Sequence, residues 1–281
     1  MNANQMGQTG EIKPEKSSPL CPAASPSDSR GFASFAGPFR LGCVPYLNAK
    51  PLLEGLDAEL LVPSALADRF AEGCYDAALI PVFEALRLPA PRIADGFGIC
   101  SHGPVHSVIV AHRTPLSETD AIVLDPASRS SVNLLRVLLK SHLKISPRLV
   151  STSADPLAAR LLIGDPALEF QRRSDPGWQV FDLGAAWTAW TGLPFVFAVW
   201  TLSSTATTSL AESLRSAARA GLAARPRIAA AEPDPAASLD YLTRSIRYDI
   251  GPPEKLAIAE FRRQLIAADL LPASAAHPEF V

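Results

Sequence analysis

The stretch AIVLDPASRSSVNLLRVLLK, residues 121–140, joins a short apolar run to the clearest helix pattern in the chain. Within it Val132, Leu135, Leu138 and Leu139 recur near the 3.6-residue spacing of one helix face. Ser128 precedes the pattern as a candidate N-terminal cap, and basic residues follow near the far end, where they suit the negative pole of the helix dipole. The stretch therefore predicts a strand followed by a helix that packs on a sheet.

Similar apolar runs occur along the rest of the chain, separated by helical patterns. Together with AIVLD (121–125), the predicted strands are FRLGCV (39–44), YDAALIPV (75–82), VHSVIVAH (105–112), ARLLIG (159–164), WQVFDLG (178–184) and FVFAVWTL (195–202). The other predicted helices are SALADRFAEG (64–73), ESLRSAARAGLAAR (212–225), LDYLTRSIRYDI (239–250) and PPEKLAIAEFRRQLIAADL (252–270). This alternation of strands and helices predicts the α/β fold class.

Length and composition limit the classes of protein to which the chain can belong. The chain has 281 residues, 48% of them hydrophobic, which favours two cores or two lobes over one compact unit. Residues 1–37 are rich in Ser, Pro, Gly and Asn and are expected to form a flexible tail outside the fold. The 26 basic and 28 acidic residues are nearly balanced, without the basic footprint of a nucleic-acid-binding protein, so a small-molecule partner is expected.

Targeting and cofactor motifs narrow the function further. The chain lacks an apolar stretch of secretory or membrane-spanning length, so we expect a cytoplasmic protein without a membrane partner. No dinucleotide-binding, P-loop, nucleophile-elbow or zinc motif occurs, so we expect no cofactor and no metal. His102, His106 and His112 do not change this, because Gly-Pro within HGPVH is incompatible with the helical spacing of a two-histidine metal site.

Polar residues at the ends of predicted strands are candidate ligand contacts, since ligands bind at strand ends in open α/β sheets. Asn48 follows a strand that Pro45 should end, and it either points into a cleft or satisfies its own backbone in a turn. Pro81 ends a second strand, after which Glu84 is either a first-turn helix residue or a catalytic base. Ser107 offers a hydroxyl near the start of a third strand.

Two strand-to-helix junctions complete the candidates. Backbone N–H groups, the helix dipole and the hydroxyls of Ser128, Ser130 and Ser131 together suit a carboxylate or phosphate, although an ordinary serine cap beside a solvated Arg129 explains the same pattern. The segment IGDP at 163–166 ends a strand, and its aspartate either caps the next helix or faces a cleft.

Taken in order, eight segments resemble one family over about residues 39–272. They are VPYLNAKPL, LVPSALA, YDAALIPVFEAL, GPVHSV, LDPASRSSVNLLRVLL, LLIGDPAL, DLGAAWTAWTGLPFVFAVW and FRRQLIAADLLP. The family is the menaquinone-biosynthesis group, which acts in the futalosine route and has a fold similar to type II periplasmic binding proteins. Its two main branches are chorismate dehydratases and enzymes that cyclise dehypoxanthinyl futalosine. WTGLPFVFAVW, VPYLN and GPVHSV favour the dehydratase branch.

The resemblance implies a two-lobed fold with a ligand cleft between the lobes. It assigns residues 38–113 and 199–281 to the first lobe and 114–198 to the second. The family's site asparagine falls on Asn48 and its site serine on Ser107, which become the expected catalytic residues. The expected substrate-binding residues are Pro81, Val82, Ser128, Arg129, Ser130, Ser131, Gly164 and Asp165. Ser130 stands where many relatives have threonine, which retains the hydroxyl.

The activity that the resemblance implies is a hydro-lyase reaction, in which chorismate loses water and yields 3-[(1-carboxyvinyl)oxy]benzoate. None of the motifs contains a convincing histidine or glutamate base, so we hypothesise that the substrate's own enolpyruvyl carboxylate takes the proton. The alternatives are the futalosine-cyclising branch and a small-anion-binding protein without catalysis. Chorismate is the expected partner, and a homodimer is compatible with the sequence.

Overall fold

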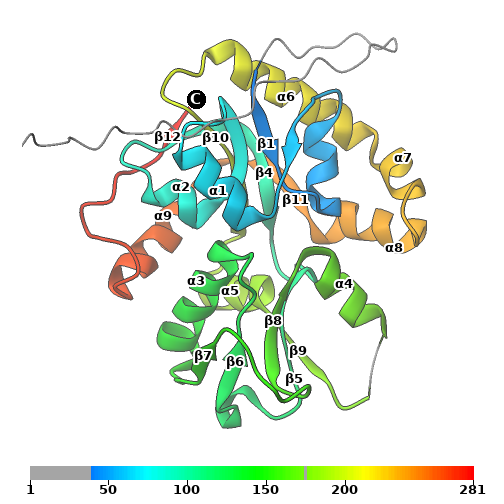
Figure 1. Ribbon diagram of the computed structural model, residues 1–281, viewed down its shortest axis with the longest axis vertical. Helices are drawn as coiled ribbons and strands as arrows, with labels where there is room; N and C mark the ends of the chain where they lie inside the picture. The colour runs from blue at the N-terminus through cyan, green and yellow to red at the C-terminus, as the bar shows by residue number, and fades with distance from the viewer. Residues whose placement is uncertain (1–38, 174–175) are drawn as a thin grey trace, which may run out of the picture.

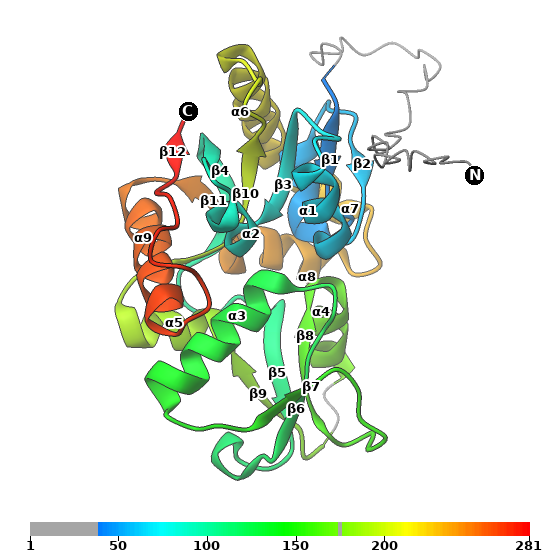
Figure 2. The ribbon, with the colours of Figure 1, turned by 60° about the vertical axis from the view of Figure 1, so that its left-hand side comes forward.

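The computed structural model describes residues 39–173 and 176–281, which form two α/β lobes stacked one above the other in Figures 1 and 2. Each lobe is built on its own mixed sheet. The tail predicted at residues 1–37 lies outside the described residues.

The larger lobe contains a sheet with the strand order β11-β4-β10-β3-β1-β2, and β12 adds to the edge of β4. Strands β1 and β3 are parallel, whereas β10 runs antiparallel to both of its neighbours, β3 and β4. The strands are β1 (Leu41–Cys43), β2 (Glu59–Leu60), β3 (Ala77–Pro81), β4 (Arg92–Ser101), β10 (Phe195–Leu202), β11 (Arg247–Ile250) and β12 (Glu279–Phe280).

Helices surround this sheet and complete the larger lobe (Figure 1). They are the 3-10 helix η1 (Leu47–Leu53), α1 (Pro63–Ala71), α2 (Val82–Arg87), α6 (Thr208–Ala223), α7 (Arg225–Ala230), α8 (Pro235–Asp240), the π-helical turn η4 (Tyr241–Ser245) and α9 (Pro252–Ala267). Pro at the first helical position suits the starts of α1 and α9, since its missing N–H would be unpaired there in any case.

The smaller lobe has the strand order β7-β6-β8-β5-β9. Its strands are β5 (Val108–His112), β6 (Ala121–Val123), β7 (Arg148–Val150), β8 (Ala159–Ile163) and β9 (Gln179–Asp182). Its helices are η2 (Leu116–Glu118), α3 (Arg129–Val137), the π-helical continuation η3 (Leu138–Leu143), α4 (Gly164–Arg173) and α5 (Leu183–Thr191).

The chain crosses between the lobes twice. Strand β5 pairs with β8 and β9 of the smaller sheet, whereas the sequence-based boundary after residue 113 assigned this strand to the first lobe. The whole of β10 pairs within the larger sheet, although the expected second lobe ran to residue 198. We therefore propose that the crossings are the connections 102–107 and 192–194.

The two lobes share an aromatic cluster beside the second crossing. Trp187 of α5 lies edge-on to Phe195 of β10 and to Phe261 of α9, with ring centroids 5.3 and 5.9 Å apart. All three side chains are buried, so the two lobes make a packed apolar contact at this cluster.

Most sequence-predicted elements are confirmed. Each of the seven predicted strand runs contains a strand. The helix predicted within 121–140 and those predicted around 64–73, 212–225 and 252–270 are present. The helix predicted over 239–250 is wrong in its second half, where β11 forms with alternating exposed and buried side chains. In the described ranges, no helix combines the length and apolar character that crossing a bilayer requires.

Candidate active site

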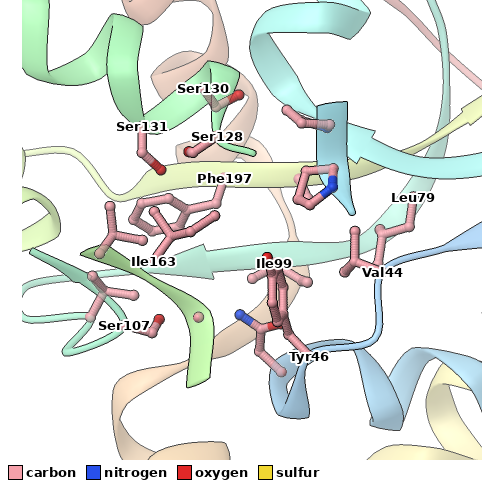
Figure 3. A pocket seen from close by; sticks show the side chains of 17 residues that line it. Val44, Tyr46, Leu79, Ile99, Ser107, Ser128, Ser130, Ser131, Ile163 and Phe197 are labelled. Carbon is pink, nitrogen blue, oxygen red and sulfur yellow. The ribbon is translucent and has the colours of Figure 1, made fainter. Parts of the chain in front are cut away.

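A cavity lies between the two lobes and holds about 560 Å³ of empty space, part of which opens to solvent. Its wall is largely apolar, with side chains such as Leu79, Ile99, Ile163 and Phe197 (Figure 3). The polar side chains in the wall are Tyr46, Asn48, Ser107, Ser128, Ser130 and Ser131. A mostly apolar cleft with a few convergent polar groups is the usual form of a small-molecule site.

The larger lobe supplies Asn48 from η1, which begins at Leu47 a few residues after the end of β1. The Nδ2 atom of Asn48 donates a hydrogen bond to the hydroxyl of Tyr241 at 3.3 Å. Its Oδ1 atom is buried and has no hydrogen-bond partner among the described residues. The amide therefore leaves one acceptor available beside the cavity.

The smaller lobe supplies Ser107, one residue before β5. The Ser107 side chain is buried, and its Oγ atom accepts a hydrogen bond from the hydroxyl of Tyr241 at 2.7 Å. The preceding residue, His106, lies outside the strand, is exposed and has a φ of 62°.

Sequence reasoning missed Tyr241, which joins the two expected catalytic side chains. Tyr241 is the first residue of η4 and is buried. Burial raises the pKa of its phenol above the ordinary value, and the hydrogen bonds with Ser107 and Asn48 act in the opposite direction. No local motif marks this tyrosine, because its partners lie 134 and 193 residues away in the chain.

The start of α3 faces the cavity from the other side, and Figure 3 shows its three serines there. Ser128 occupies the N-cap position, but its side chain makes no capping hydrogen bond, which differs from the predicted cap. The Oγ atom of Ser130 accepts a hydrogen bond from the backbone N–H of Phe83 at 2.9 Å, so its own proton remains available. First-turn N–H groups of a helix lack intrahelical acceptors and add further donors.

Three of the expected substrate-binding residues do not line this cavity. Arg129 of α3 instead forms two 2.8 Å hydrogen bonds with the carboxylate of Asp68 on α1, across the lobes. Val82 is buried at the start of α2. Asp165 lines a neighbouring cavity, where its Oδ1 accepts from the backbone N–H of Leu47 at 3.3 Å.

Pro81 and Gly164, which were also expected at the site, both line the cavity. Gly164 adopts a φ of +60°, and a Cβ atom there would lie 2.9 Å from the ring of Tyr46 in the other lobe. Glycine at this position therefore permits both the turn from β8 into α4 and the close approach of the two lobes.

No charged side chain of the described residues lines this cavity. Glu84, one of the alternatives for a base, lies in the first turn of α2 and pairs with Arg87 at 2.9 Å and Arg129 at 3.4 Å. Across the described ranges, no group of three or more His, Cys, Asp or Glu residues is placed to hold a metal ion. The polar chemistry of the cavity therefore rests on hydroxyls, one amide and backbone N–H groups.

Two α/β lobes with a cavity between them define a periplasmic-binding-protein-like protein. A Candida albicans gene product, described as having the generic periplasmic binding protein fold, matches with a TM-score of 0.56 and 12% identity, over 84% of this chain and 92% of its own. A family described as menaquinone biosynthesis matches residues 39–267, and the chain belongs to that family. The fold and the family that the sequence motifs implied are thus confirmed.

Two curated relatives carry the same name. The chorismate dehydratase of Thermus thermophilus is 29% identical over 260 residues, which cover 81% of this chain and 95% of the relative. The chorismate dehydratase of Campylobacter jejuni is 32% identical over 157 residues, which cover 54% of this chain and 58% of the relative.

Proposed function

We propose that this chain is a hydro-lyase that converts chorismate into 3-[(1-carboxyvinyl)oxy]benzoate and water. The observation that carries the proposal is an uncharged interlobe cavity in which Asn48 and Ser107 stand opposite a helix N-terminus. The similarity to relatives named chorismate dehydratase over most of the chain supports the same assignment.

The reaction needs positioning and polarisation more than a strong protein acid or base. Loss of the C3 proton and the C4 hydroxyl forms the C3–C4 double bond and makes the ring aromatic, and the two fragments leave together as water. The ring carboxylate activates the C3 proton by conjugation. Donors at the start of α3, among them the hydroxyls of Ser130 and Ser131, would stabilise the negative charge that develops on that carboxylate.

Asn48 and Ser107 would act on the departing C4 hydroxyl. The unpartnered Oδ1 of Asn48 can accept a hydrogen bond from that hydroxyl, and the Ser107 hydroxyl can donate a hydrogen bond to its oxygen. A hydrogen bond to this oxygen strengthens as the C4–O bond breaks and negative charge accumulates there.

The base in this proposal is the enolpyruvyl carboxylate of the substrate, which takes the C3 proton and passes it to the departing C4 hydroxyl, so that water leaves and the carboxylate is restored. The absence of charged side chains from the described cavity wall supports this choice, as does the pairing of Glu84 with two arginines outside the wall. Glu84→Gln should therefore keep most of the turnover. A Glu84→Gln protein that binds chorismate but does not convert it would contradict the proposal.

The direct test is incubation of the purified protein with chorismate alone, followed by mass spectrometry. The expected product is lighter than chorismate by one water molecule and has the ultraviolet absorbance of a benzoate. Unchanged chorismate would exclude the dehydratase; turnover of dehypoxanthinyl futalosine would then assign the cyclising branch, and binding without turnover an anion-binding protein.

Variants extend the test to the site. Ser107→Ala and Asn48→Ala should each lower kcat by about 10²- to 10³-fold, the range for loss of a hydrogen bond that stabilises developing charge. Ser216→Ala, on an exposed face of α6, is the matched control and should leave kcat unchanged.

A further inference from the structure

Three side chains from distant parts of the chain form one hydrogen-bonded row beside the cavity. Asn48 comes from η1, Tyr241 from η4 and Ser107 from the crossing that precedes β5. The donor–acceptor distances are 3.3 Å from Asn48 to Tyr241 and 2.7 Å from Tyr241 to Ser107. Because Ser107 directly precedes β5 of the smaller lobe, this row also connects the two lobes.

Counting donors and acceptors shows which group donates in each hydrogen bond of the row. The Nδ2 atom of Asn48 can only donate, so the Tyr241 oxygen accepts from it. The single hydroxyl proton of Tyr241 is then donated to Ser107 Oγ. Ser107 consequently has to direct its own proton elsewhere, and its side chain borders the cavity. At the opposite end of the row, Asn48 Oδ1 remains an unpartnered acceptor.

We propose that Tyr241 is a positioning residue that sets this polarity, so that Ser107 presents a donor and Asn48 an acceptor to the departing hydroxyl. The inference rests on the proposed dehydratase function. Tyr241 itself does not line the cavity that holds Asn48 and Ser107; it lines the neighbouring one. It therefore acts through these two residues and does not contact the substrate.

The surroundings of Tyr241 keep its hydroxyl protonated. The side chain is buried, and the loss of solvation raises the pKa of the phenol above its ordinary value. Asp165 and Asp182 act in the same direction through their negative charge. A phenol that stays protonated remains a donor to Ser107 throughout the pH range in which the enzyme would work.

The test is Tyr241→Phe, which removes one oxygen atom and retains the ring. Without the hydroxyl, the Ser107 proton can turn away from the cavity and the Asn48 amide loses its anchor. We expect kcat to fall about 10- to 100-fold, the range for loss of one buried hydrogen-bonding partner, while KM for chorismate changes less than threefold. The shape of the pH profile should stay the same, because Tyr241 positions a proton without releasing one.

A matched control is available on the neighbouring strand. Tyr248 is buried in β11, and its hydroxyl has no hydrogen-bond partner among the described residues. Tyr248→Phe should leave kcat unchanged. Circular dichroism and thermal unfolding of both variants, with assays repeated at low temperature, separate a folding defect from a loss of positioning.

A double-mutant cycle with Ser107→Ala gives the decisive readout. Because Tyr241 acts through both Ser107 and Asn48, adding Tyr241→Phe to Ser107→Ala should lower kcat by a smaller factor than in the wild type, and adding it to the Ser107→Ala/Asn48→Ala protein should change kcat less than twofold. Multiplicative effects, a fully active Tyr241→Phe protein, or an altered pH profile would overturn the inference. A wild-type protein that leaves chorismate unchanged would remove the proposed function and the inference together, whereas an active wild type with an equally active Tyr241→Phe removes the inference alone.

Discussion

Gly221 offers a test of how packing positions the site. It lies in the interior of α6, where glycine costs about 1 kcal/mol relative to alanine. Helix propensity alone therefore predicts that Gly221→Ala stabilises the protein. In the structure, however, a Cβ atom at Gly221 would lie 1.9 Å from the carbonyl oxygen of Pro51 and 2.6 Å from its carbonyl carbon.

The size of this clash decides whether Gly221→Ala stabilises or destabilises the protein. Both groups belong to the backbone, so no side-chain rotation can relieve the contact, and α6 and η1 would have to move apart by roughly 1 Å or more to restore ordinary contact distances. Overpacking of this kind costs about 1–3 kcal/mol, and a backbone contact belongs in the upper part of that range. After subtracting the gain in propensity, we expect a net destabilisation of about 1–2 kcal/mol and a Tm lowered by roughly 2–8 °C.

The same displacement should reach the cavity, because Asn48 lies three residues before Pro51 in η1. A misplacement of about 1 Å can lower kcat about 10²-fold. Calorimetry gives Tm and the chorismate assay gives kcat. The control is Ala220→Gly, an exposed site on the same helix, which reports propensity alone and should cost about 1 kcal/mol without a loss of kcat. A Gly221→Ala protein with a raised Tm and normal kcat would refute the packing argument.

Two further predictions concern the interlobe ion pair and the tyrosines. Arg129→Lys loses the two hydrogen bonds with Asp68 and should raise KM by no more than about fivefold, with kcat unchanged. Because the pair is partly exposed, 1 M salt should abolish the effect on KM. A large loss of kcat would show instead that Arg129 contacts substrate. Burial raises the pKa of every tyrosine in the chain: Tyr46, Tyr75, Tyr241 and Tyr248. Native protein should thus form little tyrosinate at pH 10, where the tyrosines of unfolded protein are about half ionised. Because the native state holds more protons at this pH, the free energy of unfolding should fall as pH rises above about 9. Coincident ultraviolet titrations of the native and unfolded protein would contradict this prediction.

Strands with continuous apolar runs were predictable because burial on both faces requires that pattern. Strand β3 is buried at all five positions, and β10 at all but one of eight. Strand β4 has the same central place in the larger sheet but was missed, because Asp95, Gly96 and Gly98 interrupt its apolar residues. The alternation of Tyr248 and Ile250 with polar neighbours was a usable signal for β11 that the helical interpretation overlooked.

The chemistry of the site was more predictable than its contacts. Asn48, Ser107 and the serines of α3 are small polar residues at element ends, and the structure brings them to one cavity. Arg129 belongs to the same segment, yet its charge is engaged by Asp68 from the other lobe. A local pattern specifies which hydrogen bonds a side chain can make, whereas its actual partner depends on how the two lobes pack.

This packing bears directly on the proposed base. An apolar wall without a charged side chain would disfavour the ionised form of a bound carboxylate and so raise its pKa. Hydroxyl and N–H donors at the start of α3 can offset this effect for the ring carboxylate by hydrogen bonding to it, so the ring carboxylate remains anionic and stabilised. The enolpyruvyl carboxylate, held away from those donors, would be a stronger base than it is in water. An arginine in the wall would reverse this advantage by pairing with that carboxylate, so the engagement of Arg129 with Asp68 outside the cavity favours a mechanism in which the substrate removes its own proton.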